Sequence, residues 1–119
     1  MIKGIGIDII ELYRIKQNLE RNCRFIERIL TPKEREIYAS LKTDKRKVEF
    51  VAGRFAAKEA FSKAAGTGIG KLSFQDMEVQ ILKSGAPHLY VKGFEQTNLF
   101  LSISHTREYA AAQVIIEEL

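Results

Sequence analysis

Apolar and small residues alternate with a period of two over the first ten positions of the chain, which predicts a β-strand. The isoleucines on one face of this strand are Ile5, Ile7 and Ile9. The opposite face carries Gly4, Gly6 and Asp8, so it has no large side chain and ends at a carboxylate.

The apolar spacing becomes helical from Glu11 to Leu30, with a break near Asn22. The next four residues, 31–34, combine a threonine N-cap, a proline at the first helical position and a glutamate at the third. This pattern predicts a second helix that begins at Pro32 and runs to about Leu41.

The longest predicted helix runs from about Asp44 to Ala65 and ends at Gly66. A narrow stripe of small and aromatic residues follows one side of it: Phe50, Gly53, Ala57, Ala60, Phe61 and Ala64. The opposite side is also apolar at first, and a helix that is apolar on both sides is buried between layers. Charged residues in its second half therefore need partners or a ligand, because unpaired buried charges are costly.

Antiparallel strands are predicted after a glycine-rich segment at 66–70. The predicted strand pairs are 77–81 with 88–91, and 99–105 with 110–117. A strand, then helices, then antiparallel strands indicate a single α+β domain over residues 1–119, with one long buried helix and an antiparallel sheet.

The charge of the chain is unevenly distributed. Its 119 residues carry a net charge of +4, and residues 11–50 hold 11 Lys and Arg against seven Asp and Glu. This excess predicts an anionic partner, although a solvated face without a partner is the simpler alternative.

The sequence has no apolar run long enough for a membrane span. A signal peptide needs an unbroken apolar core, and Asp8 interrupts the apolar residues near the N-terminus. We therefore expect a cytoplasmic protein, and the single cysteine, Cys23, excludes an internal disulfide.

Two carboxylates are candidates for a shared divalent cation. Asp8 lies on the glycine face of the first strand, and Glu59 lies on the charged side of the long helix. Oxygen ligands favour magnesium, which keeps several waters and takes further oxygens from phosphate. In the alternative, Asp8 caps the following helix and Glu59 pairs with Lys63 four residues later.

Cations along the long helix are candidates for phosphate binding: Lys45, Arg46, Lys47, Arg54, Lys58 and Lys63. Solvated charge at residues 45–47 and pairing within the helix are the alternatives.

Ser104 and His105 point to opposite faces of one strand, so they cannot act as nucleophile and base. His105 can instead donate to a ligand, although a lone histidine is more often structural.

Four segments together closely resemble the holo-[acyl-carrier-protein] synthases, the short bacterial class of 4'-phosphopantetheinyl transferases: GIGIDIIEL, FVAGRFAAKEAFSKAAGTGIG, LSFQDMEV and LSISHTREYAAAQVI. The resemblance runs from end to end and implies the fold of that family and a homotrimer with active sites between subunits. It implies magnesium-dependent transfer of phosphopantetheine from coenzyme A to a serine of apo acyl carrier protein. The reaction releases adenosine 3',5'-bisphosphate and supports fatty acid biosynthesis.

The resemblance also implies residue roles. Asp8 and Glu59 become the magnesium ligands, and Glu59 and Lys63 the catalytic residues. The positions that match coenzyme A contacts are Lys45, Arg46, Arg54, Ser62, Gly66, Thr67, His105 and Thr106. Those that match the surface for the acidic carrier are Arg14, Arg21, Arg24 and Arg28.

Two other functions compete with the transferase. A nucleic-acid-binding module would use the basic stretch, yet the sequence has no recognised binding motif and only four excess charges. A non-catalytic coenzyme A-binding subunit is opposed by the presence of Lys63 and both carboxylates. We therefore expect an enzyme that acts on a protein and coenzyme A, and neither a nucleic-acid nor a membrane binder.

Overall fold

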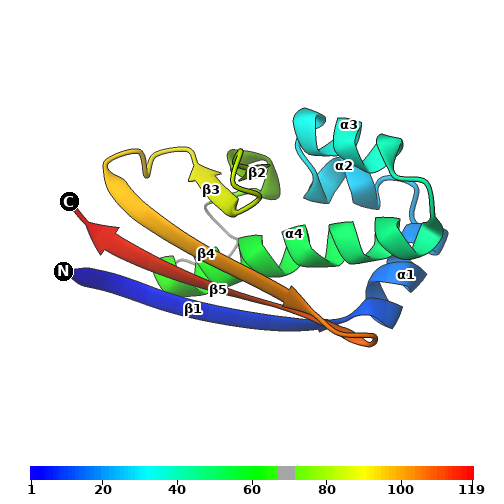
Figure 1. The fold of residues 1–119 in the computed structure, drawn as a ribbon, viewed down its shortest axis with the longest axis horizontal. Coiled ribbons are helices and arrows are strands. Elements are labelled where there is room, and N and C mark those ends of the chain that lie inside the picture. Colours follow the sequence, from blue (N-terminus) through cyan, green and yellow to red (C-terminus); the bar gives the residue numbers. More distant parts are fainter. Residues whose placement is uncertain (67–71) are drawn as a thin grey trace.

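The computed structural model describes residues 1–66 and 72–119, and these form the α+β arrangement in Figure 1. The helices are α1 Leu12–Arg21, α2 Phe25–Ile29, α3 Pro32–Ser40 and α4 Asp44–Ala65, with a short 3-10 helix η2 at Phe74–Asp76. The strands are β1 Ile2–Glu11, β2 Met77–Ile81, β3 Pro87–Val91, β4 Thr97–His105 and β5 Tyr109–Glu118. The predicted fold class and order of elements are confirmed.

The strands form two antiparallel sheets. The larger sheet has the order β1-β5-β4, so the last strand lies between the first strand and its own hairpin partner. The smaller sheet is the β2-β3 hairpin. Both predicted hairpins are therefore present, and pairing of β1 with β5 brings the two ends of the chain side by side (Figure 1).

Helix α4 lies between two layers. Figure 1 places the β1-β5-β4 sheet along one side of α4, and α2, α3 and the β2-β3 hairpin along the other. The stripe residues Ala57, Ala60 and Phe61 are fully buried, and so are Val51 and Ala52 of the other side. The expectation of a helix buried on both sides is confirmed.

Local signals set the ends of the helices. The Thr31 side chain accepts from the Glu34 N–H at 3.3 Å, and the Glu34 carboxylate accepts from the Thr31 N–H at 2.9 Å, so the predicted capping box forms. Gly66 ends α4 with φ of 74°, a left-handed conformation that suits glycine. Within the described ranges, no helix combines the length and the apolar composition needed to cross a membrane.

The two faces of β1 have opposite surroundings. The glycine face packs against α4, and the isoleucine face is open. Ile5, Ile7 and Ile9 are 61%, 63% and 64% exposed. The register places Phe100 and Tyr109 on the same side of the sheet, and both are also exposed. We call these five residues the outer apolar face.

Candidate functional site

The glycines of β1 allow the strand to approach the backbone of α4. A Cβ atom on Gly6 would lie 2.0 Å from the Ala60 carbonyl oxygen, and one on Gly4 would lie 2.0 Å from the Ala64 carbonyl oxygen. No other residue fits at these positions unless the strand or the helix moves. This close approach brings Asp8, two residues after Gly6, to the last turns of α4.

Asp8, Glu59 and Lys63 meet at this point. The Lys63 Nζ lies 2.9 Å from Asp8 Oδ1 and donates a second hydrogen bond to the Ile7 carbonyl oxygen at 3.0 Å. Partial burial raises the pKa of Glu59, the negative charge of Asp8 raises it further, and the ammonium of Lys63 opposes both. Asp8 does not cap α1, because the N-cap residue of this helix is Glu11. The Glu11 side chain makes no capping hydrogen bond.

This arrangement fits a hard divalent cation. Two carboxylates that repel each other gain from a shared positive charge, and their oxygens are the ligands that magnesium prefers. Within residues 1–66 and 72–119, no group of three or more His, Cys, Asp or Glu side chains has the geometry of a complete metal site. Asp8 and Glu59 would thus hold magnesium only in part and leave positions for water and phosphate oxygens.

A second cluster surrounds a cavity of about 510 Å³ between α4 and the end of β4, and it includes Arg46, Arg54 and His105. The Arg54 guanidinium lies 3.9 Å from the centre of the Phe50 ring, and the residue is only 8% exposed. Its Nε has no hydrogen-bond partner among the described residues. Burial lowers the pKa of Arg54, and the charge of Glu34 opposes this shift. A buried cation with an unsatisfied donor on a cavity wall is suited to an anionic ligand.

The two clusters point in different directions from α4. Arg54 and Glu59 are five residues apart, which separates them by about 140° around the helix axis. Arg46 lies about 20 Å along the axis from Glu59 at 1.5 Å per residue. One chain therefore presents the carboxylates and the arginine-lined cavity on separate surfaces.

Several residues predicted to contact coenzyme A have local partners. Ser62 is buried, and its hydroxyl donates to the Lys58 carbonyl oxygen at 3.1 Å. The Thr106 hydroxyl accepts from the N–H groups of Glu108 and Tyr109 at 3.3 and 3.1 Å, which closes the turn between β4 and β5. Thr67 lies outside the described residues.

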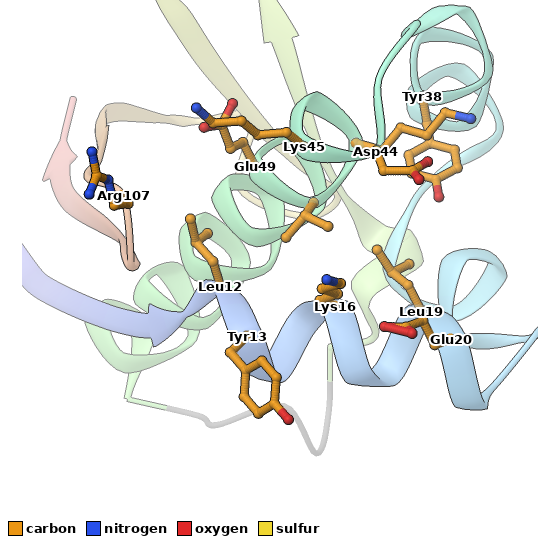
Figure 2. Close-up of a pocket in the computed structure, with 12 residues that line it drawn as sticks. Leu12, Tyr13, Lys16, Leu19, Glu20, Tyr38, Asp44, Lys45, Glu49 and Arg107 are labelled. Carbon is orange, nitrogen blue, oxygen red and sulfur yellow. The ribbon is translucent and has the colours of Figure 1, made fainter.

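Lys45 lines a different cavity, of about 600 Å³, between α1 and α4 (Figure 2). The floor of this cavity includes Leu12 and Leu19, and Figure 2 shows Lys16 and Arg107 among the charged side chains at its rim. Lys45 is thus not brought together with Arg46, its neighbour in the sequence.

The four arginines predicted to meet a carrier are exposed: Arg14 and Arg21 on α1, Arg24 before α2, and Arg28 on α2. None of them forms an ion pair with another described residue. Their charges are therefore available to a partner.

Lys58 was expected to bind phosphate, and this prediction is wrong. Its side chain is fully buried, where Nζ lies 2.6 Å from Glu34 Oε1 and donates to the Ile29 carbonyl oxygen at 2.7 Å. No local pattern indicates this pair, because the partners are 24 residues apart and the position of Glu34 predicts only a capping residue. Glu49 was also missed, although it borders both cavities and lies 3.7 Å from His105 Nε2.

A carboxylate pair beside an ammonium group, together with an arginine-lined cavity, is suited to binding a metal ion and a phosphorylated ligand. The chain belongs to the 4'-phosphopantetheinyl transferase superfamily, whose sequence profile matches residues 4–114.

Named relatives cover nearly the whole chain. It is 56% identical over 117 residues to a holo-[acyl-carrier-protein] synthase of Oceanobacillus iheyensis, covering 98% of each chain. It is 57% identical over 120 residues to that of Bacillus subtilis, covering 100% of this chain and 98% of the relative.

Solved structures agree with these relatives. The holo-(acyl-carrier-protein) synthase of Bacillus anthracis in complex with CoA (3',5'-ADP) matches with a TM-score of 0.92 and 54% identity, covering 100% of this chain and 99% of that one. The Helicobacter pylori synthase in complex with coenzyme A matches with a TM-score of 0.83 and 36% identity, covering 95% and 99%.

Proposed function

We propose that this transferase moves the 4'-phosphopantetheine arm of coenzyme A to a serine of apo acyl carrier protein, with magnesium held by Asp8 and Glu59. The observation that carries this proposal is the meeting of these two carboxylates with Lys63 on a close contact between β1 and α4. The relatives named as holo-[acyl-carrier-protein] synthases support the same reaction. From the family resemblance, we place this reaction in the cytoplasm, in the service of fatty acid biosynthesis.

The reaction makes and breaks one bond to phosphorus. The serine oxygen bonds to the phosphorus next to pantetheine, the bond from that phosphorus to the bridging oxygen breaks, and adenosine 3',5'-bisphosphate leaves. The serine is a poor nucleophile and the pyrophosphate is negatively charged, so catalysis rests on positioning and charge neutralisation. Magnesium, when bound, supplies positive charge to the attacked phosphate.

The chain's own residues act around this exchange. Lys63 uses two hydrogen bonds for Asp8 and the Ile7 carbonyl, and its third N–H, which has no partner among the described residues, can donate to an oxygen of the pyrophosphate. The same ammonium can offset charge on the leaving bisphosphate or protonate it. The serine proton passes to Glu59 or to an ordered water. A carboxylate committed to a metal is the weaker base of the two states of Glu59.

The second cluster is proposed to bind the adenosine phosphates. Arg46, Arg54 and His105 line one cavity, and the buried guanidinium of Arg54 needs an anion. Since this cavity and the carboxylates face different directions, we propose that a complete site joins the carboxylates of one subunit with the cavity of its neighbour. Lys45, Ser62, Gly66, Thr67 and Thr106 remain proposed coenzyme A contacts on the resemblance alone.

The outer apolar face supports a homotrimer of single-domain chains. Its three isoleucines are each more than 60% exposed, and soluble monomers seldom leave such a contiguous apolar patch open. Closed cyclic symmetry would place each carboxylate cluster beside the next subunit. The four exposed arginines are proposed to bind the acidic carrier, which accounts for the basic excess of residues 11–50.

The proposal is tested with purified chain, coenzyme A, magnesium and apo acyl carrier protein. We expect mass spectrometry of the carrier to detect the added mass of one phosphopantetheine group. Omission of magnesium and replacement of the acceptor serine by alanine are the controls, and both should prevent the addition. If the folded chain adds no mass under the complete conditions, the proposed reaction is wrong.

A further inference from the structure

A fully buried ion pair lies on the opposite side of α4 from the proposed magnesium site. The side chains of Lys58 and Glu34 are 0% and 1% exposed, and Lys58 Nζ lies 2.6 Å from Glu34 Oε1. Lys58 immediately precedes Glu59 on α4, although its side chain points about 100° away, toward the opposite layer. The roles proposed above leave this pair without a function.

The ion pair of Glu34 and Lys58 joins four segments of the chain. The Oε1 atom of Glu34 accepts from Lys58 on α4 and from the Thr31 N–H at the start of α3, and its Oε2 accepts from the Val79 N–H of β2 at 2.8 Å. Lys58 adds the end of α2 through the Ile29 carbonyl oxygen. The two side chains together thus fix α4 relative to α2, α3 and β2.

The pair connects the two proposed functional surfaces through neighbouring residues. Ile29 follows Arg28, which belongs to the proposed carrier surface, and Lys58 precedes Glu59, which belongs to the magnesium site. The hydrogen bond of 2.7 Å from the Lys58 ammonium to the Ile29 carbonyl oxygen therefore links the residue next to Glu59 with the residue next to Arg28.

Stability alone is a weak reason for such a pair. Desolvation of two charges offsets most of their attraction, and well-packed apolar residues of similar volume often serve stability equally well. A buried ion pair has strict geometry, however, because each of its donors and acceptors must be satisfied. Its specific contribution is to fix the orientation of the elements that it joins.

We propose that Lys58 is a positioning residue that, through Glu34 and Ile29, holds the Glu59 turn of α4 in register with the arginine-bearing helix α2. A carrier docked on α2 then presents its serine at the Glu59 site. This inference rests on the proposed roles of Glu59 and the arginines. A displacement of about 1 Å at a reacting centre can cost about 100-fold in rate, so a small rotation of α4 matters.

The main test is the double variant Lys58→Met with Glu34→Gln, which removes both charges and nearly preserves the volumes. We expect kcat with apo carrier to fall between about tenfold and 100-fold per folded molecule. The dissociation constant of the carrier, titrated without coenzyme A, should stay within about twofold, because the arginines are unchanged. Folded fractions are measured by circular dichroism at the assay temperature.

Val91→Ala is the matched control, because Val91 is a buried residue of β3 outside the network. It should lower the melting temperature and leave kcat per folded molecule unchanged. Glu34→Gln alone is the second variant. It leaves the buried ammonium of Lys58 without a counter-charge, so we expect a larger loss of stability than in the double variant and a loss of kcat per folded molecule of at least similar size.

Every outcome is decisive. Normal kcat in a folded variant with the network removed overturns the positioning role, and failure of both variants to fold makes Lys58 a folding residue and overturns it equally. A wild-type chain that transfers nothing contradicts the proposed function instead, so the two failures are distinguishable.

Discussion

At the scale of residues, the charges of Asp8, Glu59 and Lys63 oppose one another where β1 crosses α4. Lys63 is the only cation recorded in contact with Asp8 among the described residues, and its ammonium also influences Glu59. Two carboxylates thus share one positive charge and leave a net negative site. Such a site is poorly neutralised without a cation, and its chemistry depends on whether Glu59 is ionised.

Glu59→Gln should remove magnesium-dependent turnover and preserve the fold. Glutamine keeps the size of the side chain but loses the negative charge that a divalent cation requires, so we expect kcat to fall by at least about 100-fold. Carrier modification followed by mass spectrometry measures the rate, and circular dichroism checks the fold. Wild-type rates in this variant would show that Glu59 is not a magnesium ligand.

The same substitution should stabilise the metal-free protein in a pH-dependent way. Because the folded chain raises the pKa of Glu59, ionisation costs the folded state more than the unfolded state. The resulting loss of stability is absent at low pH and develops as the pH rises from the ordinary pKa of a glutamate through the raised pKa. Glu59→Gln should therefore melt at a higher temperature than the wild type at pH 7.

Thermal melts in a chelating buffer at pH 4 and pH 7 measure this difference. The difference in melting temperature should be smaller at pH 4 than at pH 7, because the cost of ionising Glu59 falls as the pH falls. A variant less stable than the wild type at pH 7 would contradict the assigned direction of the pKa shift.

At the scale of elements, the contact between β1 and α4 positions the site. A strand can approach a helix backbone this closely only where its own residues have no side chain and those of the helix have small ones, and Gly4 and Gly6 meet Ala60 and Ala64 there. The alternation of glycine with isoleucine thus gives β1 two different faces. The glycine face packs on α4 and positions Asp8, and the isoleucine face is exposed.

Gly6→Ala tests this contact. The new methyl group would lie 2.0 Å from the Ala60 carbonyl oxygen and 2.7 Å from the Ala64 nitrogen, so strand and helix must separate. We expect a loss of about 1–3 kcal/mol in the free energy of unfolding, measured by urea titration. Loss of turnover should accompany it as Asp8 moves from Glu59.

Gly53→Ala is the control, because its nearest neighbour, a methyl group of Ile103, lies at 3.4 Å. That substitution should change the stability by less than about 1 kcal/mol in either direction. Equal losses at Gly6 and Gly53 would contradict the close packing of β1 on α4.

The exposed arginines of α1 and α2 define a separate surface. Arg14→Ala should weaken carrier binding about tenfold, the value of one charge-assisted hydrogen bond, and leave coenzyme A binding unchanged. Lys16→Ala is the control, since Lys16 lies on another side of α1 and lines the cavity of Figure 2. Calorimetric titration with each substrate measures both affinities, and equal effects of Arg14→Ala on both substrates would contradict this division of labour.

Elements with strong local signals were predictable from the sequence. The capping box at Thr31 and the glycine after Ala65 fixed helix ends, and the period-two isoleucines fixed the face of Asp8. The burial and pairing of Lys58 were not predictable, because they depend on a carboxylate from another helix and a carbonyl from a third. Long-range partners leave no periodic trace in the sequence, so residue type and spacing could not separate a buried ion pair from a phosphate ligand.

At the scale of the whole molecule, the outer apolar face is exposed, and the proposed site is divided between two surfaces of the chain. One arrangement of subunits would account for both features. The outer apolar face would be costly in water, and the arginine-lined cavity lies on a different surface from the carboxylates. The proposed association of identical chains through the outer apolar face would account for both. It would cover the isoleucines and would allow one subunit's cavity to complete another's carboxylate cluster.

A mixture of two inactive variants tests this arrangement. In Glu59→Gln the cavity is intact, and in Arg54→Ala the carboxylates are intact, so each alone should be nearly inactive. After co-refolding at equal amounts, random assembly pairs an intact cavity with intact carboxylates in about a quarter of the sites. We therefore expect recovery of about a quarter of the wild-type rate in the carrier modification assay.

Ile7→Glu, introduced into both variants, is the control for assembly. A carboxylate in the centre of the outer apolar face should prevent association, because its burial is costly, and recovery should then disappear. Sedimentation analysis should find monomers under these conditions. If the original mixture recovers no activity although the chains form mixed trimers, each site lies within one chain and the apolar face serves only to hold the subunits together.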